Sequence, residues 1–116
     1  MDWDHLQARD RDGLVALQMG YSSILGLWNS ETTVRRGTFQ GDLFADVPPF
    51  TTDCNAVALV RAEVERRGLE RAYIDTLEEM AIASGQRGRV AVPWFVLNAT
   101  PDQQCLAALR AFGVEV

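Results

Sequence analysis

Residues 94–113, WFVLNATPDQQCLAALRAFG, limit the fold more than any other stretch of the chain. Thr100 stands where a helix N-cap is expected, with Pro101 at the first helical position and Gln103 placed to complete a capping box. Gly113 predicts the end of the same helix. The apolar side chains between these signals recur at helical spacing: Leu106, Leu109 and Phe112. A capped amphipathic helix is therefore predicted at this end of the chain.

The apolar run in front of this helix predicts a strand. Residues 90–97 read VAVPWFVL, and β-branched and aromatic residues of this kind favour a buried strand. Pro93 predicts an edge position or a bulge, because proline cannot donate to the hydrogen-bond ladder of a sheet. Trp94 is expected in the core.

Two consecutive helices are predicted in the middle of the chain. Residues 51–53, Thr-Thr-Asp, offer three N-cap candidates for a helix that ends at Gly68. Its apolar stripe consists of three valines: Val57, Val60 and Val64. A second helix is predicted over residues 70–83, and the polar loop 84–89 ends it.

The N-terminal half combines a helix with extended segments. The pattern predicts a helix over residues 4–19 and a strand over 32–40, followed by a turn at residues 41 and 42. Residues 42–50 are expected to be extended, because their two prolines cannot continue a helix. The order of elements predicts an α+β fold, a single domain of all 116 residues. A two- or three-stranded antiparallel sheet would be covered by about four helices.

Charge and hydropathy argue against two classes of protein. The net charge of −5 disfavours a general nucleic-acid binder. No apolar run approaches the roughly 20 residues of a membrane span. The acidic, polar start MDWDHLQARDRD is unlike a signal peptide, so a cytosolic location is the default expectation. All 11 basic residues are arginine, which fits a GC-rich genome or a need for bidentate recognition of anions.

The two cysteines predict neither a disulfide framework nor a zinc site. Cys54 and Cys105 each fall in the first turns of a predicted helix. A helix N-terminus lowers the pKa of a thiol, which allows a reactive cysteine. Buried structural thiols are the favoured interpretation for both, and a bridge between the two remains an alternative.

The sequence offers no catalytic constellation. His5 is the only histidine, and it lies near the chain terminus, where a base is poorly held. Signatures of serine hydrolases, zinc proteases and nucleotide-binding loops are missing. Pairs of acidic neighbours do not face one another on a helix and are expected to be solvated. We therefore predict no catalytic residue, no cofactor and no metal site.

Two arginine pairs are candidates for ligand or partner contacts. Arg87 and Arg89 lie in the loop 84–89, which is either a solvated turn or an anion-binding pair. Arg35 and Arg36 lie on the predicted strand, where neighbouring side chains point to opposite faces. One of these two is expected to be exposed and the other to pack along its aliphatic stem.

Three aromatic residues are further candidates. Trp3 either docks onto its own domain or anchors a partner, and both interpretations stay open. Trp28 follows an apolar ILGL segment, and core packing is the favoured interpretation. Tyr21 or Trp28 could stack on the base of a nucleotide ligand.

Three stretches together resemble the phage ABA-sandwich domain family, a group of small phage-encoded proteins. They are residues 9–21 (RDRDGLVALQMGY), residues 47–65 (VPPFTTDCNAVALVRAEVE) and the unit from Trp94 through ATP to CLAALRAFG. Residues 50–53 match its aromatic-Ser/Thr-Thr-Asp signature. Residues 69–89 depart from it, with a helix-like segment in place of another strand. The resemblance implies a phage or prophage origin and a helix–sheet–helix fold, but no activity and no catalytic residues.

Two functional hypotheses follow. The first is a non-enzymatic phage accessory protein that inhibits a host defence system by binding a host protein. The second is a sponge that sequesters a cyclic or phosphorylated nucleotide signal in a pocket shared between subunits, with the four candidate arginines and a stacked aromatic. An enzyme that uses Cys54 or a carboxylate ranks third. A homodimer is expected, because subunit pairing would cover the edges of a small sheet.

Overall fold

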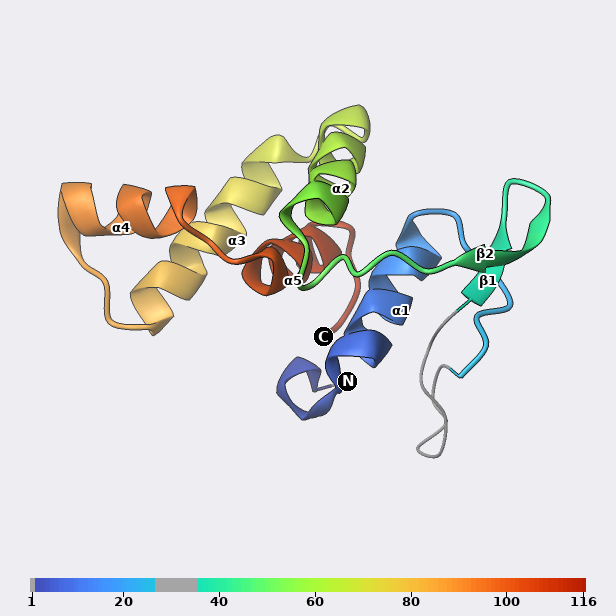
Figure 1. Cartoon of the computed structure of the whole chain (residues 1–116). Coiled ribbons are helices and arrows are strands. Elements are labelled where there is room, and N and C mark those ends of the chain that lie inside the picture. The colour runs from blue at the N-terminus through green and yellow to red at the C-terminus, as the bar shows by residue number, and fades with distance from the viewer. Residues whose placement is uncertain (1, 27–35) are drawn as a thin grey trace.

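The computed structural model describes residues 2–26 and 36–116. Within these residues, five α-helices and one antiparallel hairpin form an elongated molecule of 47 × 30 × 23 Å (Figure 1). The α+β class and the two-stranded option for the sheet are confirmed. The elements in chain order are the 3-10 helix η1 (Trp3–His5), α1 (Ala8–Gln18), β1 (Arg36–Phe39), β2 (Asp42–Asp46), α2 (Cys54–Arg66), α3 (Glu70–Ala83), α4 (Gly88–Leu97) and α5 (Pro101–Ala111).

Helix α5 lies at the centre of the helical body. Helices α1, α2 and α3 each pack against it, and α4 packs on α3. Its buried side chains are Cys105, Ala107, Ala108 and Leu109. The first three are small and let the neighbouring helices approach closely. The predicted capping box is confirmed. The Thr100 hydroxyl accepts from the Gln103 N–H at 3.2 Å, and the Gln103 side chain accepts from the Thr100 N–H at 2.9 Å.

Helices α2 and α3 match their predictions. Asp53 is the N-cap of α2, and its Oδ1 accepts hydrogen bonds from the N–H groups of Asn55 and Ala56. The predicted valine stripe is buried: Val57, Val60 and Val64. Helix α3 has the predicted bounds and buries Tyr73 and Leu77 on the side that faces α5. Burial raises the pKa of Tyr73 to about 12.

Helix α1 begins later than the predicted residue 4. Residues Trp3–His5 form a separate 3-10 turn, and α1 starts at Ala8. Leu14 is buried, but Leu17 is 42% exposed. Gly20 has φ +99°, a backbone conformation that suits glycine, and the helix ends beside it as predicted.

The hairpin turn lies at residues 40 and 41, one residue before the predicted turn at residues 41 and 42. Gln40 and Gly41 both have positive φ, +49° and +86°, which suits a tight hairpin connection. Strand β1 pairs with β2 on one side, and on its other side Thr38 exchanges two backbone hydrogen bonds with Ser22. Residues 32–35 of the predicted strand 32–40 lie outside the described residues, and the rest contains β1. Trp28 and Arg35 also lie outside them.

The predicted strand at residues 90–97 is wrong, because this segment is helix α4. Pro93 lies in its second turn, where it removes the hydrogen bond to the Arg89 carbonyl and its ring crowds that carbonyl, so packing must offset this cost. Val96 packs against the core. Packing on α3 outweighs the modest helix propensity of valine. Four side chains on the inner side of the helix are half-buried: Ala91, Val92, Phe95 and Val96. Neither α4 nor any other helix in the described ranges is long and apolar enough to cross a membrane.

Candidate functional site

The most deeply buried polar group is a clamp between α1 and the segment that precedes α2. Asp12 is 1% exposed. Its Oδ1 accepts from the Thr51 N–H at 2.8 Å and the Thr51 hydroxyl at 2.7 Å. Its Oδ2 accepts from Arg9 at 2.7 Å, and Arg9 also donates to the Val47 carbonyl at 2.8 Å. Both carboxylate oxygens are thus engaged, so the group holds the fold and is closed to a ligand.

Structural contacts account for three of the four residues at positions 50–53. Phe50 is 1% exposed in the core, and its carbonyl accepts a hydrogen bond from the Cys105 thiol at 3.3 Å. Thr51 binds Asp12, and Asp53 caps α2. Three of the four positions therefore fasten α1, α2 and α5 together, and none of the three is a free catalytic group.

The two cysteines differ in their surroundings. Both are free thiols, so they are not bridged to each other. Cys105 is buried, as expected, and burial raises the pKa of its thiol, with the Asp12 and Asp102 charges adding to the effect. Cys54 is exposed at the start of α2, which corrects the expectation that it is buried. The buried thiol is a poor nucleophile, because the thiolate is the reactive form.

Trp3 docks onto its own domain. Its side chain is 3% exposed, and its Nε1–H donates to Asp102 Oδ2 at 3.3 Å. The Arg11 guanidinium lies 5.1 Å from the centre of the Trp3 ring and donates to Asp102 Oδ1 at 2.9 Å. Trp3 is therefore a core anchor that ties the N-terminus to α5, and the partner-contact alternative is excluded for it. His5 is exposed and pairs with Asp2 at 2.9 Å.

The three candidate arginines that lie among the described residues do not gather into one site within one copy. Arg36 lies on the hairpin, where it pairs with Asp46 at 3.1 Å. Arg87 precedes α4 and donates to the carbonyls of Ile82 and Gln86, both at 2.8 Å. Arg89 is exposed on the first turn of α4. Since the hairpin and α4 lie at opposite ends of the molecule (Figure 1), Arg36 cannot share a pocket with Arg87 or Arg89 of the same copy.

Tyr21 is already stacked. Its ring lies 4.2 Å from that of Phe39 between centroids, with an interplanar angle of 7°. Burial raises the pKa of Tyr21, and the nearby Asp46 carboxylate adds to the increase. One face of the ring is therefore occupied by a protein side chain that fastens residues 21–26 to the hairpin.

Strand β2 presents two large apolar side chains to solvent. Leu43 and Phe44 are 65% and 64% exposed, although neighbours on a regular strand point to opposite faces. The register shifts in the middle of the hairpin, so both residues stand opposite Thr38, as in a β-bulge. Asp42 and Asp46 bracket the pair. We call Asp42, Leu43, Phe44 and Asp46 the hairpin surface. Alternating apolar and polar residues do not predict it, because Leu43 and Phe44 are neighbours in the sequence.

The outer edge of β2 is partly closed. In the described part of the chain β1 has pairing on both sides, whereas β2 pairs only with β1. The Phe44 N–H donates to Asp42 Oδ1 at 2.9 Å. An added strand would therefore have to displace this side chain, which is one way in which exposed edges resist pairing.

Helix α4 exposes an apolar face of its own. Val90, Trp94 and Leu97 are 81%, 66% and 80% exposed, and Pro93 between them is also exposed. The expected core position of Trp94 is therefore wrong. Helix α4 buries none of its residues, because only its opposite side packs on the body of the protein. Val90, Pro93, Trp94 and Leu97 form the α4 face.

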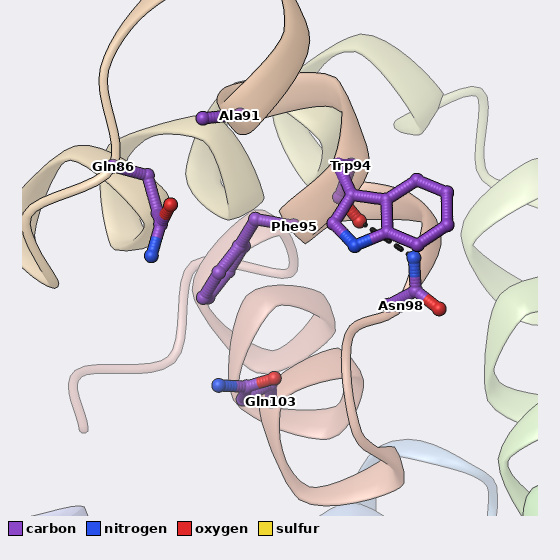
Figure 2. Close-up of a pocket in the computed structure, with 6 residues that line it drawn as sticks. All are labelled: Gln86, Ala91, Trp94, Phe95, Asn98 and Gln103. Atoms are coloured by element: carbon purple, nitrogen blue, oxygen red, sulfur yellow. Dashed lines mark hydrogen bonds between the residues drawn. The ribbon is translucent and has the colours of Figure 1, made fainter.

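A shallow pocket lies beside this helix, between α4 and the start of α5 (Figure 2). Its volume is about 220 Å³. The Phe95 ring projects between the carboxamides of Gln86 and Gln103. Asn98 Nδ2 donates to the Trp94 carbonyl at 2.9 Å, which leaves Asn98 Oδ1 free. These six residues, which include no acid or base, form the amide pocket: Gln86, Ala91, Trp94, Phe95, Asn98 and Gln103.

The described residues contain no group of three or more His, Cys, Asp or Glu side chains that could hold a metal ion. Comparisons with protein-family models, with curated proteins and with solved structures find no match to this chain. The hairpin surface, the α4 face and the amide pocket are the candidate binding sites among the described residues.

Proposed function

We propose that this chain is a non-enzymatic phage or prophage accessory protein. In this proposal it acts in the cytoplasm of the bacterial host and inhibits a defence system by binding a host protein. The observation that carries the binding role is the hairpin surface, where Leu43 and Phe44 are each about two-thirds exposed at one end of the molecule. A protruding aromatic side chain beside an aliphatic one is typical of protein interfaces. The phage origin rests on the sequence resemblance.

Charge narrows the chemistry of the partner. Asp42 and Asp46 flank the apolar pair, and the whole chain carries a net charge of −5. A partner surface with an apolar centre and basic flanks would complement this pattern. Such a pattern speeds association and selects against acidic partners. Proteins that handle nucleic acids carry basic surfaces of this kind.

The direct test is capture of the partner from lysate of the native bacterial host, followed by mass spectrometry. The bait variants are Phe44→Ser and, as a matched control, Leu59→Ser, which alters an exposed apolar side chain on α2. We expect the wild type and the control to retain the same host protein and Phe44→Ser to lose most of it. Removal of an aromatic anchor commonly weakens binding by about 2 kcal/mol or more, roughly thirtyfold.

Two results would contradict the proposal. One is that no host protein is retained above background at low salt, where charge-assisted binding is strongest. The other is that Phe44→Ser retains the partner as well as Leu59→Ser does.

The amide pocket favours a second candidate function, sequestration of a nucleotide signal. Side-chain amides of Asn and Gln can pair with the edge of a nucleobase, and aromatic rings can stack on its face. The pocket offers both, with free polar atoms on Gln86 beside the Phe95 ring and on Asn98 beside the Trp94 ring. Its 220 Å³ falls below the roughly 300–1,000 Å³ of drug-sized sites. It therefore suits a single base better than a whole dinucleotide.

The arginines support this second candidate less well than the sequence predicted. Arg89 is six residues before Phe95, which places the two side chains well apart around α4. Calorimetry with a panel of mononucleotides and cyclic nucleotides tests the idea. Binding that Phe95→Ala abolishes and Phe44→Ser preserves would establish it, and silence across the panel would eliminate it.

A further inference from the structure

The α4 face is the least protected apolar surface among the described residues. At 3.6 residues per turn, its four side chains fall within an arc of about 100°. The side chains at the back of the same helix are half-buried: Ala91, Val92, Phe95 and Val96. Helix α4 is thus apolar on both sides, a pattern that occurs in helices covered all round. One side is covered by the chain itself, and the other is open.

We propose that a second copy of this chain covers the α4 face, with the two α4 helices packed antiparallel about a two-fold axis near Trp94. Val90, Trp94 and Leu97 are four and three residues apart, the alternating spacing of a helix–helix seam. An isologous pair places Val90 of each copy against Leu97 of the other and brings the two Trp94 rings together.

Charge favours a second copy over a foreign, charged partner. The α4 face carries no ionisable side chain, and Arg89 is the one charged residue of the helix. In the antiparallel pair the two Arg89 side chains stand at opposite ends of a helix about 15 Å long. Each then lies near the C-terminal carbonyls of the other α4, where a cation is stabilised. A parallel pair would instead bring the two arginines together.

The hairpin surface does not support the same kind of pairing. An antiparallel pairing of two β2 strands that aligns residues 43–45 would put Asp42 of each copy opposite Asp46 of the other. Like charges directly opposite destabilise a strand pair. The bridge from Arg36 to Asp46 offsets only part of this repulsion, because both side chains are exposed to solvent. The Asp42 side chain also occupies the Phe44 N–H. The dimer that the sequence predicts through strand edges is therefore assigned to α4.

The size of the face sets the expected strength. With about 150–250 Å² for an aromatic side chain, the exposed parts of Val90, Trp94 and Leu97 amount to roughly 400 Å² per copy. Both copies would bury roughly 800 Å² in this seam, below the 1,200–2,000 Å² of standard stable interfaces. We therefore expect a reversible dimer with a dissociation constant in the micromolar range.

Sedimentation equilibrium of the full chain, from about 5 to 500 µM, tests the proposal in that range. The variants are Leu97→Glu and the matched control Leu43→Glu, which changes a comparably exposed leucine on the hairpin. We expect the wild type and Leu43→Glu to dimerise alike and Leu97→Glu to weaken the dimer at least tenfold. A strict monomer across the range, or a dimer that Leu43→Glu and not Leu97→Glu disrupts, would overturn the proposal.

A disulfide trap tests the geometry and does not depend on the stability of Leu97→Glu. In a Cys54→Ser background, where the one native thiol left is the buried Cys105, Trp94→Cys should give a cross-linked dimer under mild oxidation. Arg89→Cys should not, because the two positions are far apart in the antiparallel pair. The reverse outcome would exclude this packing. Host capture is measured on the hairpin surface, so either proposal can fail without the other.

Discussion

Helix α4 and the β-hairpin lie at opposite ends of the molecule and both expose large apolar side chains, but their surroundings differ in charge (Figure 1). Val90, Trp94 and Leu97 have no ionisable neighbour within their face, whereas two aspartates bracket Leu43 and Phe44. Apolar area alone does not choose a partner, because almost any apolar surface can cover another. The charges at its border decide whether a second copy is tolerated or repelled.

The helical body lies between the two surfaces, and removing Asp12 should destabilise it. In Asp12→Ala, Arg9 and Thr51 lose their shared partner in a buried site. The variant loses three hydrogen bonds to a buried carboxylate, which together cost about 3–5 kcal/mol. Urea unfolding should show this loss, and Asp12→Asn, which keeps one acceptor oxygen, should lose less. A loss below about 1 kcal/mol for Asp12→Ala would contradict the assignment of a structural clamp.

The two tryptophans sharpen the contrast between core and surface. Trp3 is 3% exposed and Trp94 is 66% exposed. We expect Trp3→Ala to lower the free energy of unfolding by about 3–5 kcal/mol. Trp94→Ala, measured at a concentration where the chain is monomeric, should lower it by less than about 1 kcal/mol. Equal losses in thermal or urea unfolding would show that the α4 face is not a free surface.

The capping signals were readable from the sequence because they act locally. Thr100, Gln103 and Asp53 satisfy N–H groups within their own helix turn, and the valine stripe of α2 repeats at the helical period. Helix α4 was missed because valines and aromatic residues favour strands, while packing on α3 decided the outcome. The sequence could not place the candidate arginines relative to one another, because helical and strand spacing do not tell which ends of a molecule meet. The Asp12–Thr51 clamp joins residues 39 positions apart, which no local pattern reveals.

The aspartates of the hairpin surface should control how binding to the proposed host protein depends on salt. In Asp42→Asn/Asp46→Asn the apolar pair remains but the attraction to basic flanks is lost. We expect association of the captured partner to slow several-fold at low ionic strength and to depend less on salt than in the wild type. Surface plasmon resonance at two salt concentrations measures both. An unchanged salt dependence would remove the electrostatic part of the proposal.

The smallest expected effect lies on α2, away from both surfaces. Hydrogen bonds from Arg66 and Arg67 lower the pKa of Glu63 from 4.5 to about 2. Because the folded pKa lies below the unfolded one, the stabilisation is present above about pH 4.5 and is lost as pH falls toward 2. It should amount to less than about 1 kcal/mol, since solvent screens this surface cluster. Urea unfolding at pH 6 and pH 3 should show a smaller acid-induced loss in Glu63→Gln than in the wild type.

Our central claim is that the α4 face self-associates because it carries no charge, whereas Asp42 and Asp46 prevent the hairpin surface from doing so. The most direct test removes these two carboxylates. In Asp42→Thr/Asp46→Thr both the repulsion and the Asp42 cover on the Phe44 N–H are gone. A chain with two self-pairing surfaces at opposite ends forms open polymers. Sedimentation should therefore show species larger than the dimer, whereas the charge-matched control Glu65→Gln/Glu70→Gln stays dimeric. A double threonine variant that sediments like the wild type at every concentration would contradict the account.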